Sequence, residues 1–195
     1  MTTLADPVAV LVDLQARFCS TAFDYLDAAG EAEVTAAVEA TNAFLARYRA
    51  SGRTPIFVRT HHDESTNSPV WARKYTGGPI PCRPGSAGAA FVDGLDVRPS
   101  DVVVTKHRYD AFHGTPLDGY LSANGVTRLL VGGVATHVCV ESTVRSAFDR
   151  DYDPTVLADC TASADPALKA DALARIDGQF GAVAGSADVA LEPVD

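Results

Sequence analysis

The stretch Val8-Ala-Val-Leu-Val-Asp13 places five apolar residues directly before an acidic one. Short apolar runs rich in β-branched residues are typical of strands buried on both faces of a parallel sheet. Comparable runs recur along the chain, mostly separated by stretches of helical character, which indicates repeated strand–helix–strand units. The further strands predicted in this way are Pro55–Val58, Val102–Thr105, Arg128–Gly132 and Thr155–Ala158.

Four segments are predicted to be helices. In Glu31–Ala50, apolar residues such as Val34, Val38 and Leu45 recur at helical spacing, and the glycine of Ser51-Gly52 suits a helix C-cap. The same signals predict helices at Pro116–Ala123, Val138–Arg150 and Pro166–Asp177, whereas Val183–Val189 fits neither type clearly. The alternation of strands and helices predicts an α/β fold with a parallel sheet.

Length and composition predict one globular domain over residues 1–195. The chain is 47% apolar and 21% charged, which suits a single buried core. Its net charge is −9, and no dense basic run occurs, so we expect a solvated acidic surface and no nucleic-acid partner. The sequence shows no basic leader and no apolar run of membrane-spanning length, which favours a cytoplasmic protein with no membrane partner.

The four cysteines are widely spaced and form no CxxC pair. This spacing disfavours a zinc knuckle or a disulfide framework in a chain of this size. One of Cys19, Cys82, Cys139 and Cys160 could therefore be a nucleophile.

The segment His61–Gly88 differs from the rest of the chain because proline, glycine, serine and polar residues dominate it. Connections of this length without regular structure are uncommon in compact domains and are often functional. We interpret residues 61–88 as a lid or substrate loop.

Several reactive side chains directly follow predicted strands. Asp13 follows the first strand, His61 and His62 the second, Lys106 the third, and the run Gly133–Cys139 the fourth. Ligands of open parallel α/β sheets bind outside the carboxyl ends of the strands. We therefore expect an acid, a lysine and a cysteine to converge at one edge of the sheet.

These three residue types together suit nucleophilic catalysis. Cys139 lies near a predicted helix start, where the helix dipole favours a thiolate, and Lys106 would add positive charge. Asp13 could take the thiol proton and return it to a leaving amine. Taken singly, each has a plainer interpretation: a small buried hydrophobic residue for Cys139, a surface lysine for Lys106 and a turn cap for Asp13.

Three segments together resemble the signature regions of the isochorismatase-like hydrolases: Val10-Leu-Val-Asp-Leu-Gln-Ala-Arg-Phe18, Lys106-His-Arg-Tyr-Asp-Ala-Phe-His-Gly-Thr-Pro-Leu117 and Gly132-Gly-Val-Ala-Thr-His-Val-Cys-Val-Glu-Ser-Thr143. In order and spacing the resemblance covers residues 8 to about 165. We therefore expect a three-layer Rossmann-like fold, with a doubly wound, mostly parallel sheet of about six strands and helices on both faces.

The resemblance also implies site residues. It implies a catalytic triad of Asp13 as acid–base, Lys106 as electrostatic partner and Cys139 as nucleophile. It further implies a cis peptide between Val134 and Ala135, and an oxyanion hole formed by the backbone N–H groups of Ala135 and Cys139. It implies no cofactor, and a homo-oligomer, either a dimer or a tetramer.

Within the family, the cysteine and the second strand favour one branch. Some vinyl-ether hydrolases replace the cysteine, so its retention favours amide chemistry. Nicotinamidases hold a metal through an aspartate two residues before a histidine, which the run Thr60-His61-His62-Asp63 lacks, so we expect no metal. Lys106–Leu117 and Pro84–Gly88 most resemble the N-carbamoylsarcosine and ureidoacrylate amidohydrolases, which implies a small amide, carbamoyl or ureido substrate.

Substrate contacts are the least determined part of this interpretation. Arg108, Arg83 and Arg59 are candidates to bind a substrate carboxylate, or are surface salt-bridge residues. The full set of expected contacts is Phe18, His61, Trp71, Arg108, Tyr109, Phe112 and His137. The alternatives left open are a Cys139–His137 dyad, a vinyl-ether hydrolase, a nicotinamidase-like amidase and a non-catalytic binding module.

Overall fold

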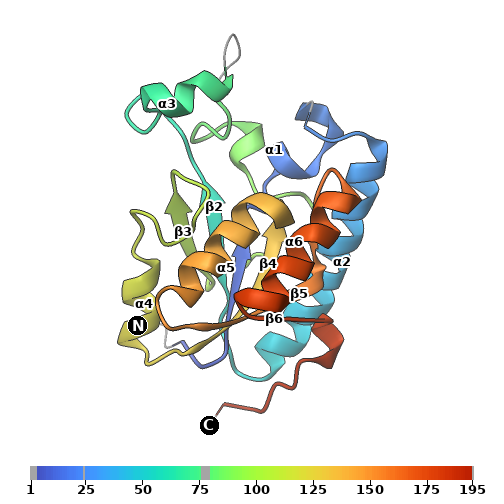
Figure 1. Cartoon of the computed structure of the whole chain (residues 1–195), viewed down its shortest axis with the longest axis vertical. Coiled ribbons are helices and arrows are strands. Elements are labelled where there is room, and N and C mark those ends of the chain that lie inside the picture. The colour runs from blue at the N-terminus through green and yellow to red at the C-terminus, as the bar shows by residue number, and fades with distance from the viewer. Residues whose placement is uncertain (1–3, 24, 76–79, 195) are drawn as a thin grey trace.

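The computed structural model of the chain describes residues 4–23, 25–75 and 80–194. Its described part contains a six-stranded sheet in which every pair of neighbouring strands is parallel. The strand order is β3-β2-β1-β4-β5-β6, so the first strand lies in the middle of the sheet (Figure 1). The strands are β1 (Val8–Val12), β2 (Ile56–Thr60), β3 (Val102–Lys106), β4 (Arg128–Val134), β5 (Asp153–Ala162) and β6 (Ala182–Ala184).

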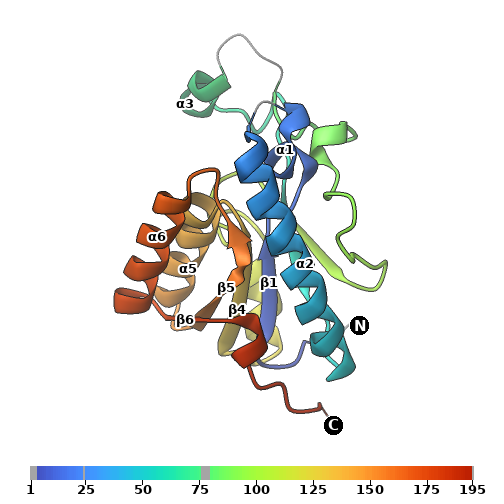
Figure 2. The ribbon, with the colours of Figure 1, turned by 90° about the vertical axis from the view of Figure 1, so that its right-hand side faces the viewer.

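Helices cover both faces of this sheet, which confirms the expected three-layer α/β fold (Figure 2). The long helix α2 (Ala28–Ala50) lies on one face, and α5 (Glu141–Phe148) and α6 (Pro166–Gln179) lie on the other. The shorter helices are α1 (Ala16–Cys19), α3 (Pro69–Ala72) and α4 (Leu117–Ala123).

The all-apolar sequence of β1 follows from its central position, because both of its faces are covered. Val10 and Val12 pack on the side of α5 and α6, in one core cluster with Val144 and Ile176. Leu11 points to the opposite side and packs with Val34 and other residues of α2. All five residues of β1 are completely buried. Burying an aliphatic side chain of this size contributes about 1.5–3 kcal/mol, so β1 anchors both halves of the core.

Element boundaries differ from the predicted ones mainly at strand and helix ends. The strand predicted to end at Gly132 continues to Val134, and the helix predicted to start at Val138 is preceded by a π-helical turn, Thr136–Val140. The unassigned segment Val183–Val189 contains the end of β6 and a 3-10 turn, Ser186–Asp188.

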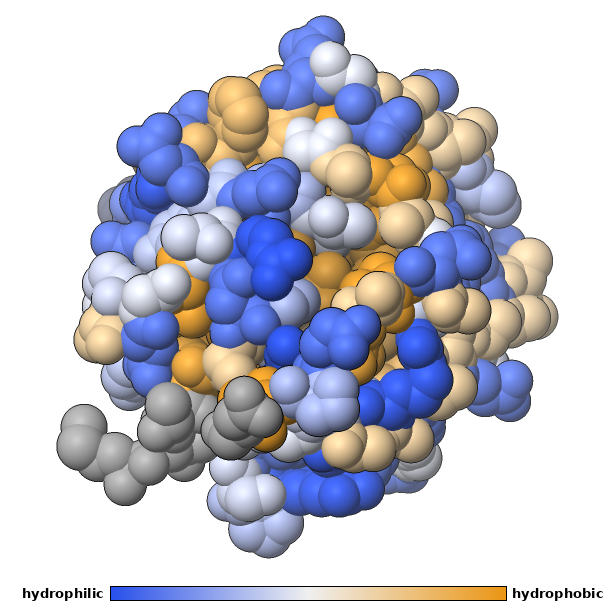
Figure 3. All heavy atoms as spheres, turned by 90° about the horizontal axis from the view of Figure 1, so that it is seen from below, coloured by the Kyte–Doolittle hydropathy of each residue, from blue (hydrophilic) through white to orange (hydrophobic). Residues whose placement is uncertain are grey.

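The segment predicted as a lid contains little regular structure in its described part. It includes α3, 3-10 turns at Arg73–Tyr75 and Ala87–Ala89, and residues 76–79, which lie outside the described residues. The segment follows β2 and rises beyond the end of the sheet (Figure 1). At the opposite end of the molecule, hydrophilic and hydrophobic residues are intermingled over the surface (Figure 3). No helix within the described ranges has both the length and the apolar character that crossing a membrane requires.

Candidate active site

Asp13, Lys106 and Cys139 meet at the carboxyl end of the sheet. Asp13 directly follows β1, Lys106 is the last residue of β3, and Cys139 lies in the π-helical turn after β4. The Lys106 Nζ is 2.6 Å from the Asp13 Oδ2 and 3.7 Å from the Cys139 Sγ. Asp13 is 1% exposed, Lys106 is 0% exposed and Cys139 is 9% exposed. A lysine and an aspartate thus form an ion pair beside a thiol, almost entirely out of water.

The backbone at this edge has two unusual turns. Asp13 has a φ of 55°, in the left-handed region that aspartate tolerates better than most residues, and its N–H donates to the Val58 carbonyl at 2.8 Å. Gly133 has a φ of 120°, and a Cβ there would lie 2.0 Å from the Val12 carbonyl oxygen. Only glycine therefore lets the end of β4 pass so close to β1, which brings the Cys139 turn against Asp13. The peptide bond between Val134 and Ala135 is cis.

Burial determines the resting protonation of Cys139. Burial raises the pKa of its thiol far above the ordinary range, the negative charge of Asp13 raises it further, and Lys106 opposes both effects. At Lys106 burial acts to lower the pKa, but the charges of Asp13 and Cys139 outweigh it and raise the pKa, so the ammonium persists. The sequence positions of Cys139 and Lys106 alone would favour a free thiolate at rest. In the structure, the helix start and the lysine do not hold one, because burial outweighs them. A base must remove the thiol proton.

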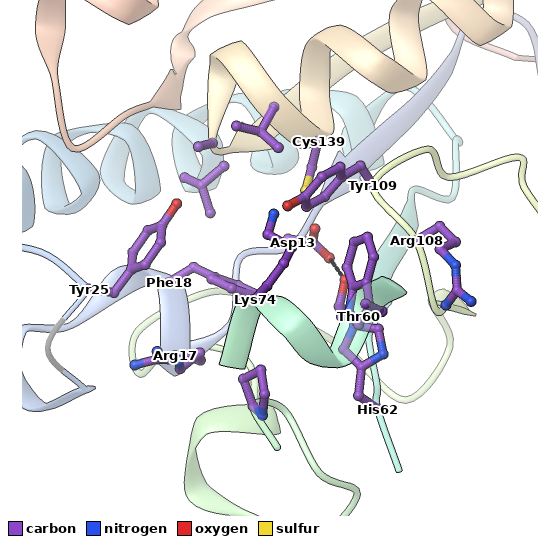
Figure 4. Close-up of a pocket in the computed structure, with 15 residues that line it drawn as sticks. Asp13, Arg17, Phe18, Tyr25, Thr60, His62, Lys74, Arg108, Tyr109 and Cys139 are labelled. Atoms are coloured by element: carbon purple, nitrogen blue, oxygen red, sulfur yellow. Dashed lines mark hydrogen bonds between the residues drawn. The ribbon is translucent and has the colours of Figure 1, made fainter. Parts of the chain in front are cut away.

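Asp13 and Cys139 lie at one wall of a cavity of about 250 Å³, and the buried Lys106 contacts both of them. Its apolar lining includes the rings of Phe18, Tyr25, Trp71 and Tyr109, and its cationic lining consists of Arg17, Lys74 and Arg108. In Figure 4, Lys74 extends from the lid toward Tyr109 and Cys139, whereas the guanidinium groups of Arg17 and Arg108 point away from the thiol. The Lys74 Nζ lies 4.3 Å from the centre of the Tyr109 ring. Lys74 is thus the cavity cation directed at the thiol.

Four of the seven residues expected to contact the substrate line this cavity: Phe18, Trp71, Arg108 and Tyr109. The other three are placed elsewhere. Phe112 packs in the core, with its ring stacked on Tyr152, because its segment turns inward after Tyr109. The His61 carbonyl contacts His107, and the His137 Nδ1 lies 3.0 Å from the Ser163 Oγ. His137 therefore faces away from the cavity in which the Cys139 Sγ lies.

Two arginines considered as carboxylate ligands are also engaged outside the cavity. Arg59 donates to the Thr105 hydroxyl at 3.1 Å, and Arg83 forms an ion pair with Glu64 on the surface.

Several cavity residues were not predicted from the sequence. Thr60 ends β2, so the rule that ligands bind at strand ends could have identified it. Arg17 lies within the first signature segment and Lys74 within the predicted lid, although neither side chain was singled out, whereas Tyr25 lies in an irregular segment that carries no sequence signal for a site. His62 also lines the cavity and accepts a hydrogen bond from the Trp71 indole at 3.0 Å. Burial, helped by the positive charges of His107, Lys106 and Arg108, lowers the pKa of His62 to about 4, so the imidazole is neutral near pH 7.

Metal-binding side chains do not gather in the part of the chain that the structure describes. No three histidine, cysteine, aspartate or glutamate side chains among those residues are placed so that they could share a metal ion. The site instead holds an acid and a thiol at the cavity wall and a buried ammonium beside them, and these groups can transfer protons and attack a carbonyl carbon.

Comparisons with known proteins show the family of the chain. A family model described as Isochorismatase domain matches residues 7–188. The chain belongs to the isochorismatase family. The ureidoacrylate amidohydrolase RutB of Methylorubrum extorquens is 36% identical to this family member over 192 residues, which cover 89% of this chain and 77% of that protein.

Two further relatives extend the comparison. RutB of Methylobacterium radiotolerans is 51% identical over 98 residues, which cover 50% of this chain and only 38% of that protein. The crystal structure of N-carbamoylsarcosine amidase from Thermoplasma acidophilum matches this isochorismatase-family fold with a TM-score of 0.76 and 26% identity, over 95% of this chain and 99% of that one.

The buried ion pair of this isochorismatase-family protein predicts a specific pattern of stability. Lys106→Met should lower the free energy of unfolding by about 3–5 kcal/mol, because it leaves Asp13 buried without its counter-charge. Asp13→Asn combined with Lys106→Met should recover most of the loss, since no charge remains buried. Urea unfolding at pH 7 measures the free energy of unfolding of both variants. Arg128→Met is the control: it breaks an exposed ion pair with Asp6 and should cost about 1 kcal/mol or less. A double variant as unstable as Lys106→Met would contradict this explanation.

Proposed function

We propose that the chain hydrolyses a C–N bond in a small amide, carbamoyl or ureido compound that carries a carboxylate. The observation that carries this proposal is the buried Asp13–Lys106–Cys139 cluster at the wall of a cavity of about 250 Å³. A thiol beside a proton acceptor is suited to attack a carbonyl carbon and form a covalent intermediate. The names of the relatives, ureidoacrylate amidohydrolase and N-carbamoylsarcosine amidase, point to the same kind of bond.

In the first half of the proposed reaction, Asp13 takes the thiol proton as the Cys139 sulfur attacks the substrate carbonyl carbon. The carbonyl oxygen gains negative charge, which the backbone N–H groups of Ala135 and Cys139 would stabilise. Oxyanion donors of this kind contribute about 3–4 kcal/mol each in other hydrolases. Asp13 then gives its proton to the departing nitrogen, the C–N bond breaks, and an acyl or carbamoyl group remains on sulfur.

In the second half, a water molecule attacks the thioester carbon and Asp13 takes a proton from it. Collapse of the new tetrahedral intermediate breaks the C–S bond, and Asp13 gives its proton to the departing sulfur, which regenerates the thiol. Throughout, Lys106 stays protonated, because its pKa is raised, and its positive charge stabilises the sulfur whenever the sulfur is negative. Asp13 thus acts as base and acid in turn.

The carboxylate of the substrate is inferred from the charge of the cavity. Among the described residues, its lining contains the cationic side chains of Arg17, Lys74 and Arg108 and a single acidic side chain, Asp13, which is paired with Lys106. In the described part of the chain, the contacts of the Lys74 ammonium are the faces of Trp71 and Tyr109 rather than a carboxylate. An anionic group on the substrate would supply the missing counter-charge.

A panel of small substrates tests the proposal. N-carbamoyl amino acids and ureido acids should release ammonia or amine, and Cys139→Ala should reduce the rate at least about 10³-fold while leaving the fold intact. The panel should include nicotinamide and a vinyl ether that releases pyruvate. Turnover of the vinyl ether alone, or a Cys139→Ala rate within tenfold of the parent, would refute amide hydrolysis through Cys139.

Lys74 provides a separate prediction about selectivity. Lys74→Met keeps the length of the side chain but removes its charge, so it should raise KM for a carboxylated substrate about tenfold or more and leave KM for the neutral amide analogue within about twofold. Steady-state kinetics on the matched pair of substrates measures the difference. Arg73→Met, next in the chain but outside the cavity lining, is the control and should behave as the parent. An equal effect of Lys74→Met on both substrates would rule out charge recognition.

A further inference from the structure

The order of strands places Thr60 between the two charged residues of the site. In the sheet, β2 lies between β1 and β3, and Thr60 is paired in register with Lys106. Asp13 follows β1 on the other side of β2. The Thr60 side chain is buried, and its hydroxyl contacts both neighbours, accepting from the Lys106 Nζ at 2.8 Å and donating to the Asp13 Oδ1 at 2.9 Å.

The direction of these hydrogen bonds follows from the number of protons available. A lysine ammonium can only donate, so Thr60 must accept from Lys106, and its single hydroxyl proton is then directed to the Asp13 carboxylate. This commits Oδ1 of Asp13 as an acceptor (dashed line in Figure 4). Among the described residues, the Lys106 Nζ at 2.6 Å is the donor nearest the buried Oδ2, and no other donor occupies that oxygen, which keeps a second lone pair. Oδ2 therefore has room to receive a proton.

The three N–H groups of Lys106 are likewise shared among the acceptors around it. One is directed to the Thr60 hydroxyl and one to the Arg108 carbonyl at 2.9 Å. The third remains for two acceptors, the Asp13 Oδ2 at 2.6 Å and the Cys139 Sγ at 3.7 Å. When Oδ2 is negative it attracts this N–H more strongly, and once Oδ2 is protonated and the sulfur is negative the preference reverses.

Gln15 holds the backbone of Thr60 in place. Its side-chain oxygen accepts from the Thr60 N–H at 2.7 Å, and its amide donates to the Thr60 carbonyl at 3.0 Å and to the Ala89 carbonyl at 2.8 Å. Gln15 is completely buried, two residues after Asp13 in the chain. Two of these hydrogen bonds tie Thr60, which bridges the ion pair, to the segment that carries Asp13, and the third ties that segment to Ala89.

We propose that Thr60 is a positioning residue for the proposed reaction. Its hydroxyl keeps Oδ1 of Asp13 and one N–H of Lys106 occupied, so that Oδ2 exchanges a proton with Cys139 and the third N–H of Lys106 passes between Oδ2 and sulfur. The S–H bond breaks as the O–H bond on Oδ2 forms, and the positive charge stays on Lys106. The assignment rests on the cysteine mechanism proposed above.

Without the hydroxyl, a second N–H of Lys106 becomes available to Asp13. The carboxylate would be held more tightly by the ammonium and would accept the thiol proton less readily, and the positive charge would move away from the sulfur. Removal of the hydroxyl should therefore make Cys139 harder to deprotonate, whereas serine, which keeps the hydroxyl, should preserve the behaviour of the parent.

The test compares Thr60→Val, Thr60→Ser and the parent in two assays. Iodoacetamide alkylation of Cys139, followed by peptide mass mapping across accessible pH values, should be about tenfold slower in Thr60→Val at each pH. This ratio corresponds to a tenfold smaller thiolate population and a midpoint about one pH unit higher. The kcat for the best substrate should fall about 30-fold with KM within threefold, because the interaction lost acts on the chemical step. Thr60→Ser should stay within about threefold of the parent in kcat and keep the parent midpoint.

Two controls keep the outcome decisive. Thr41→Val removes a hydroxyl that is equally buried in α2, where it bonds to the Ala37 carbonyl, and should match the parent in both assays. Thr60→Ala, a second variant without the hydroxyl, replaces Thr60→Val should the latter not fold, as judged by its thermal unfolding. An unchanged alkylation midpoint in a folded hydroxyl-free variant, or a Thr60→Ser variant as impaired as Thr60→Val, would overturn the proposal.

The alkylation assay needs no substrate, so it separates this proposal from the proposed function. A shifted midpoint in a protein that hydrolyses no ureide or amide would support Thr60 as a positioning residue and refute the substrate assignment. A parent that hydrolyses these substrates, with an alkylation midpoint unchanged in Thr60→Val, would support the substrate assignment and refute Thr60 as a positioning residue.

Discussion

The site depends on the burial of a lysine and an aspartate beside a thiol. Charged groups are strongly destabilised away from water unless they are paired and hydrogen-bonded, so Lys106 and Asp13 require each other and the polar groups around them. Those groups are supplied by the sheet: Thr60 from β2 bridges the pair, and the Val58 carbonyl accepts from the Asp13 N–H. The register of β1, β2 and β3 therefore also determines how Asp13, Thr60 and Lys106 lie relative to one another in the site.

In the proposed mechanism, the same burial lets a cysteine with a raised pKa act as a nucleophile. A thiolate exposed to solvent would be stabilised at rest. In the proposed reaction the negative charge on sulfur forms only as Asp13 becomes neutral, with the Lys106 ammonium 3.7 Å from the sulfur. In such a water-poor site the ammonium interacts strongly with whichever neighbour carries the negative charge. Whether the proton is on Cys139 or on Asp13, one negative charge thus lies beside Lys106.

The strand pattern predicted most of the fold and the places where Asp13 and Lys106 end their strands, because buried parallel strands have a strong local signature. The resemblance to a family added their expected roles and that of Cys139. The sequence could not predict the π-helical turn at Thr136–Val140, because no local pattern of residues distinguishes it from an ordinary helix start. Nor could it predict Lys74 or Tyr25 in the cavity, since irregular segments are positioned by tertiary contacts. Phe112 was expected in the cavity but packs on Tyr152, because proximity to Tyr109 in sequence does not fix which way a loop residue points.

Direct observation of the covalent intermediate tests the central claim, that Cys139 carries the acyl or carbamoyl group. The parent protein is mixed with excess substrate, quenched in acid within one turnover and measured by intact mass and peptide mapping. The account predicts a mass increase equal to the acyl or carbamoyl fragment, located on the peptide that contains Cys139 and absent from Cys139→Ala. Turnover that proceeds with no adduct at any quench time, or with the adduct on Cys19, Cys82 or Cys160, would contradict it.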